Sequence, residues 1–251
     1  MNLFNLEGKV ALVTGGNRGL GGAMAYGLAQ AGADIAIVQR SKEETEVAKS
    51  IRDLGRKCET FSFDLSETKD LPELVDSVIK QLGKIDILVN NAGVQRRSPS
   101  EEFSEEDWDL VMQVNSKAVF FLCQTVGRKM LQQGKGKIIN LASLLSYQGG
   151  FTVPEYAASK GGVAQFTKSL SNEWASKNVN VNAIAPGYMA TEMNTALIND
   201  EKRSRQILER IPAGRWGNPE DMVGAVVFLA SNASDYVNGE TITVDGGWMG
   251  R

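Results

Sequence analysis

Short apolar runs alternate with longer amphipathic segments along nearly the whole chain of 251 residues. The runs that we predict to be strands are Val10–Val13, Ile35–Val38, Thr60–Phe63, Ile85–Val89, Lys137–Leu141, Val179–Ile184 and Thr241–Val244. The predicted helices are Gly19–Ala31, Glu43–Leu54, Asp70–Leu82, Glu105–Gln133, Glu155–Lys177 and Pro219–Ala230. Nearly unbroken apolar runs are typical of parallel strands that are buried on both faces. The pattern therefore predicts an α/β fold, a single-domain doubly wound sheet of seven parallel strands spanning residues 1–251, with helices on both faces.

One segment, residues 188–217, breaks this alternation. It contains a short charged helical pattern, Asp200–Arg210, before the next regular helix begins. An insertion after a parallel strand lies at the carboxyl edge of the sheet, where such folds bind their ligands. We interpret the segment as a substrate lid, because long insertions are often functional; a surface loop without a function is the alternative.

The composition excludes several kinds of chemistry. The chain has no histidine, which removes Ser-His-Asp catalysis and histidine-ligated metals, and Cys58 and Cys123 are too few for a thiolate zinc site, so we expect no metal. Both cysteines lie in apolar stretches and are predicted to be reduced core residues of a cytoplasmic protein. A formal net charge of −3 argues against nucleic acid as the main partner. No secretory signal is visible, and no apolar run approaches the roughly 18 residues that cross a bilayer, so we expect no membrane partner.

The first apolar run leads directly into a glycine-rich turn, Thr14–Gly21, and then into a helix. Gly15 permits the tight turn, Gly19 lets the backbone approach a pyrophosphate, and Gly21 lets the helix pack closely on the strand. The start of the helix then offers unpaired N–H groups to the phosphates. This context favours a dinucleotide site of the Rossmann type over a merely structural turn, although the spacing is Gly-x-x-x-Gly-x-Gly. The cofactor contacts predicted in the turn are Gly15, Asn17, Arg18, Gly19, Leu20 and Gly21.

The second strand ends at Gln39 and Arg40. A carboxylate at this position would hold the ribose hydroxyls of NAD, and none is present. Arg40 could instead contact the 2′-phosphate of NADP, or it could be a solvated arginine at the end of a strand. These residues alone leave the choice between NAD and NADP open.

A tyrosine and a lysine lie four residues apart in the helical segment that begins at Glu155. Tyr156 and Lys160 would share one face of that helix. A tyrosine ionises near pH 10, which is too high for proton transfer at neutral pH, but a nearby cation lowers that pKa. The pair is therefore a candidate general acid/base, although Tyr-x-x-x-Lys taken alone is usually a surface pair.

Polar residues follow the fourth and fifth strands and interrupt the long helical segment. Ser143 comes after the strand Lys137–Leu141, so its hydroxyl should lie at the carboxyl edge of the sheet, where it could hydrogen-bond a substrate carbonyl. Asn115 stands in an apolar part of a helix; such an amide is usually a surface residue, but a buried one would need a purpose, such as holding water in a proton relay. The small residues after the fourth strand leave room for a cofactor, and the contacts predicted there are Asn91, Ala92 and Gly93.

Together these motifs resemble the short-chain dehydrogenase/reductase family. The matching residues, in order over essentially the whole chain, are Thr14-Gly15, Gly19-x-Gly21, Asn90-Asn91-Ala92-Gly93, Asn115, Ser143, Tyr156-x-x-x-Lys160 and Pro186-Gly187. The resemblance implies an NAD(P)-dependent oxidoreductase whose catalytic residues are Asn115, Ser143, Tyr156 and Lys160. The further cofactor contacts it implies are Gln39, Arg40, Asp64, Leu65, Tyr156, Lys160, Pro186, Gly187, Met189 and Thr191. Gln39 departs from the pattern, because NAD-using relatives often carry Asp there.

Two variable loops indicate the class of substrate. Arg96 and Arg97 follow the fourth strand and could bind a carboxylate in bidentate fashion, or they could be solvated charges of a loop. Polar side chains after Ser143, in residues 144–150, could contact hydroxyl groups. We therefore expect a polyhydroxy acid rather than a long acyl chain. The residues predicted to bind the substrate are Gln95, Arg96, Ser143, Gln148 and Tyr156.

Further stretches resemble one subgroup of the family, the sugar-acid dehydrogenases of uronate breakdown. These stretches are residues 142–150, 172–175, 183–191, 211–217 and 244–248. The activity of the subgroup is that of a 2-dehydro-3-deoxy-D-gluconate 5-dehydrogenase, also called 2-deoxy-D-gluconate 3-dehydrogenase, and gluconate 5-dehydrogenase is its near neighbour. The subgroup resemblance implies NAD, with NADP as the alternative coenzyme. The family resemblance implies a homotetramer that uses the helical segments 105–133 and 155–177.

Two other functions stay open at this point. Reduction of a 3-oxoacyl carrier protein would need a basic patch to dock the acidic carrier, and the helix after Lys160 offers only Lys168 and Lys177, while Arg128 and Lys129 add some support. A nucleotide-binding regulator that has lost catalysis should lack at least one acid/base residue, whereas all four are present.

Overall fold

One parallel sheet runs through the molecule. The computed structural model describes residues 3–251, and its strands follow the order β3-β2-β1-β4-β5-β6-β7, with every neighbouring pair parallel. The strands are β1 Val10–Thr14, β2 Asp34–Gln39, β3 Cys58–Ser62, β4 Ile87–Asn90, β5 Gly136–Leu141, β6 Val179–Pro186 and β7 Thr241–Val244. The predicted fold class, a doubly wound seven-stranded parallel α/β sheet, is confirmed. Residues 1 and 2 of the predicted domain lie outside the described part of the chain.

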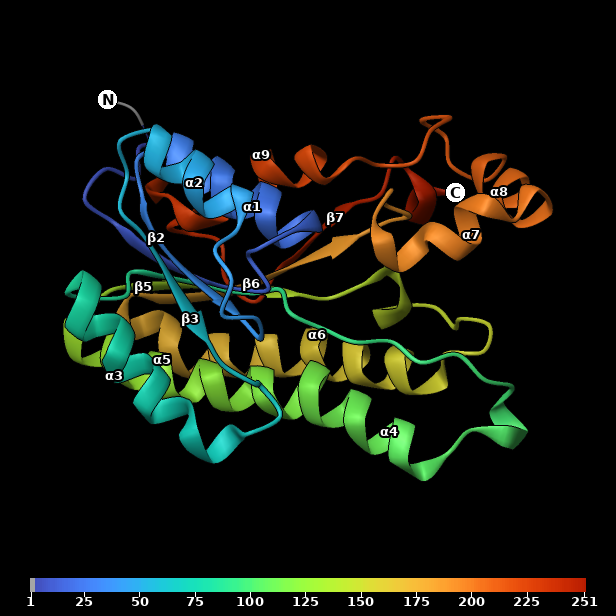
Figure 1. Ribbon diagram of the computed structural model, residues 1–251, viewed down its shortest axis with the longest axis horizontal. Coiled ribbons are helices and arrows are strands. Elements are labelled where there is room, and N and C mark those ends of the chain that lie inside the picture. The colour runs from blue at the N-terminus through green and yellow to red at the C-terminus, as the bar shows by residue number, and fades with distance from the viewer. Residues whose placement is uncertain (1–2) are drawn as a thin grey trace.

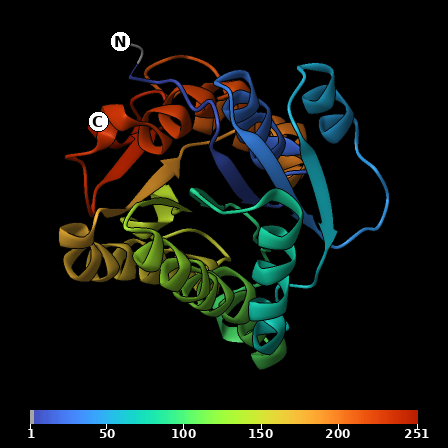
Figure 2. The same cartoon turned by 90° about the vertical axis from the view of Figure 1, so that its left-hand side faces the viewer.

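Helices cover both faces of the sheet, as Figure 1 and the turned view in Figure 2 show. One face is covered by α1 Gly19–Gln30, α2 Glu46–Asp53 and α9 Val223–Ala230, and the other by α3 Leu71–Leu82, α5 Ala118–Gln133 and α6 Pro154–Trp174. In β1, Ala11 and Val13 pack toward the first layer and Leu12 toward the second, which is the two-residue period of a strand. Cys58 and Cys123 are free and buried, as predicted.

The long helical segment predicted over Glu105–Gln133 is interrupted. α4 Glu105–Met112 and α5 Ala118–Gln133 are separated by a π-helical turn, Gln113–Lys117. Single π turns inside helices are frequent at functional sites. The prediction of one regular helix is wrong here, because the spacing of apolar residues reports which face is buried and not the hydrogen-bond spacing of a single turn.

The segment predicted to be a lid, residues 188–217, leaves the carboxyl end of β6. It contains α7 Thr195–Asn199 and α8 Glu201–Leu208, which lie together beyond that end of the sheet (Figure 1). A parallel bridge between Met189 and Gly217 joins its two ends. The segment therefore leaves the sheet at the edge where a lid is expected, and its action as a lid stays a prediction.

Among residues 3–251, no helix is both long enough and apolar enough to cross a membrane. Within the same residues, no group of three or more cysteine, aspartate or glutamate side chains is arranged to hold a metal ion.

Candidate functional site

The turn after β1 has the geometry of a phosphate-binding loop. Gly15 and Gly19 have φ angles of +63° and +53°, a backbone conformation that glycine adopts without strain. A Cβ atom on Gly21 would lie 2.1 Å from the carbonyl oxygen of Gly15, so only glycine lets α1 pack this closely on the turn. Gly15 and Gly21 therefore have the turn and packing roles that their spacing predicts, and the approach of a pyrophosphate to Gly19 stays a prediction.

The N-terminus of α1 is open toward this turn. Its N-cap residue, Arg18, is extended and makes no capping hydrogen bond with its side chain. A Cβ atom on Gly19 would meet no atom within 4 Å, and the neighbouring Asn17 and Leu20 are half-buried. Unpaired N–H groups at a helix start and open space over a glycine suit an anionic phosphate. The residues present therefore fit the pyrophosphate of a dinucleotide.

Thr14 joins the end of β1 to the end of β4. Its Oγ1 accepts hydrogen bonds from the backbone N–H groups of Asn91 at 3.0 Å and Ala92 at 3.1 Å. In return, Nδ2 of Asn91 donates to the carbonyl oxygens of Thr14 at 3.0 Å and Gly15 at 3.2 Å. The segment that carries the predicted contacts Asn91, Ala92 and Gly93 is thus fixed against the glycine turn.

The side chain of Gln39, at the end of β2, is turned to the following loop. It is buried, and its Nε2 donates to the carbonyl oxygens of Ser41 at 3.0 Å and Glu43 at 2.7 Å. These bonds hold the loop in a non-helical turn, so α2 begins at Glu46 and not at the predicted Glu43. Gln39 therefore fixes the loop that follows β2, next to the predicted ribose site, through these two hydrogen bonds.

Arg40 and Asp64 lie at the ends of neighbouring strands. Both are exposed, Arg40 after β2 and Asp64 after β3, and Leu65 is half-buried beside them. Hydrogen bonds from Ser66 hold the pKa of the Asp64 carboxyl below its ordinary value, and the positive charge of Arg40 adds to that lowering. Two of the predicted cofactor contacts are therefore close in space, and the cation among them is free to meet an anionic group in solvent.

Asn115 is completely buried in the π-helical turn. Its Oδ1 accepts a hydrogen bond from the N–H of Val94 at 2.8 Å, and its Nδ2 donates to the carbonyl oxygen of Val94 at 2.8 Å. Nδ2 also lies 3.4 Å from Oγ of Ser159 in α6. A Cβ atom on Gly93 would come within 3.2 Å of Oδ1, so a small residue is needed there. The Asn115 amide therefore holds the backbone that follows β4 through two hydrogen bonds.

Ser143 and Tyr156 come together at the carboxyl edge of β5. Ser143 caps a short turn, in which its Oγ accepts a hydrogen bond from the N–H of Leu145 at 3.1 Å. Burial raises the pKa of Tyr156 to about 12, while its hydrogen bond with Ser143 and the positive charge of Arg97 act to lower that pKa. The direction is opposite to the lowering expected from Lys160, because desolvation of a phenolate outweighs the neighbouring groups.

Lys160 is buried one helical turn after Tyr156. Its Nζ donates a hydrogen bond to the carbonyl oxygen of Leu141 at 2.5 Å and lies 5.8 Å from the centre of the Tyr156 ring. Burial lowers the pKa of Lys160 to about 8. The side chain is thus largely charged at neutral pH, and it loses its proton at a lower pH than a surface lysine does.

The predicted nicotinamide contacts follow β6. The N–H of Gly187 donates to the carbonyl oxygen of Val244 at 2.9 Å, and a Cβ atom on Gly187 would lie 2.6 Å from Cα of Asp245. The end of β6 therefore packs against the end of β7 as only glycine allows. The other contacts predicted here are the half-buried Pro186 and Thr191 and the buried Met189.

Arg96 and Arg97, in the loop after β4, have different partners. Arg96 forms an ion pair with Asp107 of α4, in which Nε lies 3.0 Å from Oδ1. Arg97 donates through Nη2 to Oε1 of Gln95 at 3.0 Å, and it is the arginine whose charge acts on Tyr156. The predicted substrate contact is Arg96, which stays a prediction, whereas Arg97 is the arginine whose charge acts on the pKa of Tyr156.

Gln148 connects three segments on the substrate side. Its Oε1 accepts hydrogen bonds from Nε1 of Trp248 at 3.2 Å and from the guanidinium of Arg210 at 3.5 Å. The guanidinium carbon of Arg210 also lies 4.0 Å from the centre of the Trp248 ring. This predicted substrate contact therefore ties the segment after β5 to the end of the predicted lid and to the C-terminal turn.

Three residues shape the site without having been predicted as contacts. Thr14 enters the prediction only as part of the glycine turn, although a hydroxyl before such a turn is a usable signal. Arg97 is not among the predicted contacts, although it lies beside Arg96 in the same loop. Glu155 looked like an ordinary acidic residue in the first turn of a helix, and no pattern sets it apart. It is completely buried, and its Oε2 has no partner among the described residues.

Similarity to known proteins covers the whole chain. Residues 9–202 match the model of the family described as short chain dehydrogenase. The chain is 55% identical to the 2-dehydro-3-deoxy-D-gluconate 5-dehydrogenase of Escherichia coli (strain K12), over 100% of this chain and 99% of that protein. It is 49% identical to the protein of the same name from Bacillus subtilis (strain 168), over 99% and 97% of the two chains. The solved structure of a gluconate 5-dehydrogenase from Burkholderia cenocepacia J2315, in complex with NADP and tartrate, has a TM-score of 0.96 at 44% identity and covers 100% of this chain and 98% of its own. The chain therefore belongs to the short-chain dehydrogenase family of NAD(P)-dependent oxidoreductases.

Proposed function

We propose that this chain is an NAD(P)-dependent dehydrogenase of sugar acids, and specifically a 2-dehydro-3-deoxy-D-gluconate 5-dehydrogenase. The observation that carries the chemistry is the meeting of Ser143, Tyr156 and the buried Lys160 at the carboxyl edge of the sheet, which is also the edge where α1 begins. The substrate is supported by relatives of that name that are 55% and 49% identical over nearly the full length of both chains.

Tyr156 is the proposed general acid/base. In the oxidation, the C–H bond of the substrate carbinol breaks, its electron pair leaves as hydride, and the hydroxyl proton passes to the oxygen of Tyr156 in its phenolate form. Bound NAD(P) would supply the hydride acceptor at its nicotinamide ring. Ser143, which is hydrogen-bonded with Tyr156, would hold the substrate oxygen while its charge changes. In the reduction, Tyr156 returns the proton to the same oxygen.

Lys160 and Asn115 are proposed to support this proton transfer. A charged ammonium near Tyr156 favours the phenolate form, and a Lys160 pKa of about 8 keeps most of that charge at neutral pH. Asn115 is proposed as the fourth member of the group. Its clasp on Val94 holds the π-helical turn beside Ser159, which lies between Tyr156 and Lys160 in α6. Asn115 would thus act on the proton path by fixing this turn.

The carboxylate of the substrate is proposed to bind Arg97. An arginine presents a planar pair of N–H donors that matches a carboxylate, and the charge of Arg97 already acts on Tyr156. Gln95 is hydrogen-bonded to Arg97, and Gln148, in the segment after β5, accepts hydrogen bonds from Trp248 and Arg210. These amides are proposed to contact substrate hydroxyls, while Arg96 supports the loop through Asp107.

NAD is the coenzyme that we propose, with NADP as a second coenzyme that the chain can bind. The subgroup resemblance favours NAD. NADP binding is supported by the lack of a carboxylate at the end of β2, by the exposed Arg40, and by the NADP in the Burkholderia relative. Fluorescence titration with each coenzyme measures the preference directly, and a tighter Kd for NADP than for NAD would reverse it.

The segment 188–217 is proposed to act as a lid. Its Glu192 forms an exposed ion pair with Arg18 of the glycine turn. The guanidinium of Arg203 in α8 lies 5.7 Å from the centre of the ring of Phe151, an exposed residue in the segment after β5. These contacts link the segment to both the coenzyme side and the substrate side, and exposed pairs of this kind are weak enough to open and close.

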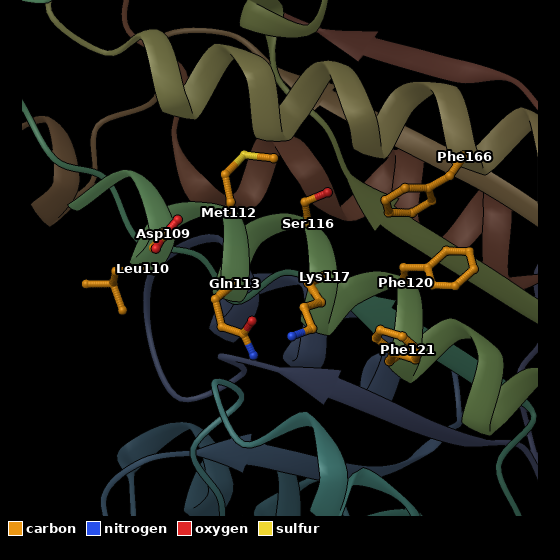
Figure 3. Close-up of a pocket in the computed structure, with 9 residues that line it drawn as sticks. All are labelled: Asp109, Leu110, Met112, Gln113, Ser116, Lys117, Phe120, Phe121 and Phe166. Carbon is orange, nitrogen blue, oxygen red and sulfur yellow. The ribbon is translucent and has the colours of Figure 1, made fainter. Parts of the chain in front are cut away.

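A cleft between the α4–α5 segment and α6 supports a homotetramer. Its apolar lining includes Met112, Phe120, Phe121 and Phe166, and Figure 3 shows the three phenylalanines together at one end. Asp109 and Lys117 also line it, so two copies related by a two-fold axis could pair opposite charges across an apolar contact. Light scattering should give the mass of four chains, and a monomer would contradict this assembly.

We also propose a cytoplasmic location, because both cysteines are free and buried.

A substrate panel tests the proposed function. The purified protein is assayed by NAD(P)H absorbance with 2-dehydro-3-deoxy-D-gluconate, gluconate and an acetoacetyl thioester, each with both coenzymes. We expect the highest kcat/KM with the first substrate. Turnover of the thioester without turnover of either sugar acid would instead indicate a 3-oxoacyl reductase. Tight coenzyme binding with no turnover across the panel would indicate a nucleotide-binding protein without catalysis.

A further inference from the structure

Glu155 carries a buried carboxyl group that the proposed chemistry does not use. It stands directly before Tyr156 in the first turn of α6 and is completely buried. Its Oε1 accepts a hydrogen bond from the backbone N–H of Arg96 at 3.4 Å, while Oε2 has no partner among the described residues. Burying an incompletely paired carboxylate is costly, so a group of this kind calls for a specific explanation.

The loop that Glu155 contacts, residues 94–98, is held at alternate residues. Val94 is clasped through both of its backbone groups by Asn115, at 2.8 Å each. Arg96 is held through its backbone by Glu155, and its side chain is held by the ion pair with α4. The backbone of the loop is therefore anchored on the two elements that border the site, the π-helical turn and α6.

The next anchor of this loop comes from a strained residue. The N–H of Ser98 donates to the carbonyl oxygen of Thr152 at 3.1 Å. Thr152 has a φ angle of +62°, in the left-handed region that a β-branched residue rarely adopts. Strain of this kind costs on the order of 1–3 kcal/mol and persists where the surrounding structure requires it, often at functional sites. A strained backbone and an unpaired carboxylate oxygen thus occur three residues apart, both against the same loop.

The residues between these anchors include Gln95 and Arg97, which are the proposed substrate contacts of this loop. Arg97 is hydrogen-bonded to Gln95 at 3.0 Å and acts by its charge on Tyr156. We infer that Glu155 is a positioning residue, whose buried carboxylate fixes the loop so that Arg97 meets the substrate carboxylate. The inference rests on the proposed function only in taking Arg97 as the residue that binds that carboxylate.

Steady-state kinetics with the sugar acid test this inference. Glu155→Ala should raise KM about tenfold, the scale of one lost charge-assisted hydrogen bond, with kcat within about twofold. The Kd of the coenzyme, measured by fluorescence titration, should not change. Because Glu155 acts through Arg97, adding Glu155→Ala to Arg97→Ala should raise KM no further. An unchanged KM in Glu155→Ala, or fully additive effects in the double variant, would overturn the inference.

Two matched variants separate positioning from a general structural role. Glu155→Gln keeps an oxygen that can accept from the Arg96 N–H, so its KM should stay within about twofold of wild type. Glu106→Gln changes the same kind of residue at an exposed position in the first turn of α4 and should have no effect. A Glu155→Gln variant as impaired as Glu155→Ala would contradict the role assigned to the hydrogen bond. If Glu155→Ala does not yield folded protein, Glu155→Ser takes its place.

Hydrogen exchange measures how well the same loop is held and does not depend on turnover. Amides of residues 94–98 should exchange faster in Glu155→Ala than in wild type and Glu155→Gln, because an anchor has been removed. If the wild type oxidises no sugar acid, the proposed function fails, while the exchange experiment still decides whether Glu155 anchors the loop. If the wild type is active but exchange and KM are both unchanged in Glu155→Ala, the positioning role alone fails.

Discussion

The coenzyme side and the substrate side of the site are built from different interactions. On the coenzyme side, the ends of β1 and β4 are joined by four hydrogen bonds of Thr14 and Asn91, and Gly21 packs without room for a methyl group. On the substrate side, the loops are joined by exposed pairs such as Arg96 with Asp107. The contacts that join β1 to β4 are thus uncharged and fixed in geometry, whereas the pair that joins the substrate loop to α4 is charged and exposed.

The difference has a physical consequence for how each side tolerates change. An exposed ion pair contributes about 0–1 kcal/mol, so a substrate loop can be rebuilt with little cost to the fold. A tightly packed backbone contact has no such freedom, because a single added methyl group must displace main-chain atoms. Changes on the coenzyme side should therefore lower stability and coenzyme affinity together. Changes on the substrate side should alter KM alone.

Replacement of Tyr156, where the two sides meet, should give the largest effect. Tyr156→Phe keeps the ring and removes the oxygen that exchanges the proton, so kcat should fall about 10²–10⁴-fold. Coenzyme Kd should stay within about twofold, because the phosphate turn is untouched. Single-turnover kinetics and fluorescence titration measure the two quantities. Wild-type turnover in this variant would remove Tyr156 from the proposed chemistry.

The charge of Lys160 should be visible in the pH dependence of stability. Its pKa is about 8 in the folded protein, against an ordinary value of 10.5. At pH 7 the folded state bears the cost of a buried charge. Between pH 8 and 10.5 the unfolded state binds more protons at this site, so stability should rise, by up to about 3 kcal/mol.

A comparison with Lys160→Met isolates this contribution. The free energy of unfolding is measured by denaturant titration of both proteins at pH 7 and pH 10, and wild type should gain relative to the variant. Tyr156, whose pKa is raised from 10.0 to about 12, lowers stability as the pH rises between these two values, so its effect only begins at pH 10. A difference between the proteins that is the same at both pH values would show that Lys160 is not desolvated in the folded protein.

The residues at the edge of the sheet could be predicted because strand ends are predictable. In a parallel doubly wound sheet, the ends of all strands meet at one edge, so residues after different strands must be neighbours. From the apolar pattern alone, that rule predicts that Ser143 lies at the same edge of the sheet as the glycine turn. Tyr156 and Lys160 followed, since a four-residue spacing on a helix puts both on one face.

What could not be predicted depends on single contacts between distant segments. The π-helical turn changes the hydrogen-bond spacing for only five residues, and nothing in their composition marks it. The choice between Arg96 and Arg97 depends on Asp107, which lies in another element. Glu155 is distinguished only by the loop packed over it. Such features follow from the tertiary arrangement and not from local pattern.

A methyl group on Gly21 tests the rigidity of the coenzyme side. Gly21→Ala would place Cβ 2.1 Å from the Gly15 carbonyl oxygen and 2.3 Å from Nδ2 of Asn91. We expect a loss of about 1–3 kcal/mol of stability together with weaker coenzyme binding. Gly224→Ala in α9, where a Cβ meets no atom within 4 Å, is the matched control and should be neutral or slightly stabilising. Normal coenzyme binding by Gly21→Ala would show that this side is not rigid.

The smallest effect should come from Arg40, which is an exposed charge at the end of β2 on the coenzyme side. If it contacts the 2′-phosphate, Arg40→Ala should weaken NADP binding about three- to tenfold and leave NAD binding unchanged, because an exposed pair contributes about 1 kcal/mol. Lys42→Ala, at another exposed position in the same loop, is the matched control for loss of a positive charge. Equal Kd values for wild type and Arg40→Ala with both coenzymes would make Arg40 a solvated residue at a strand end. The coenzyme preference would then depend on other residues at the ends of β2 and β3, such as the buried Gln39 and the exposed Asp64.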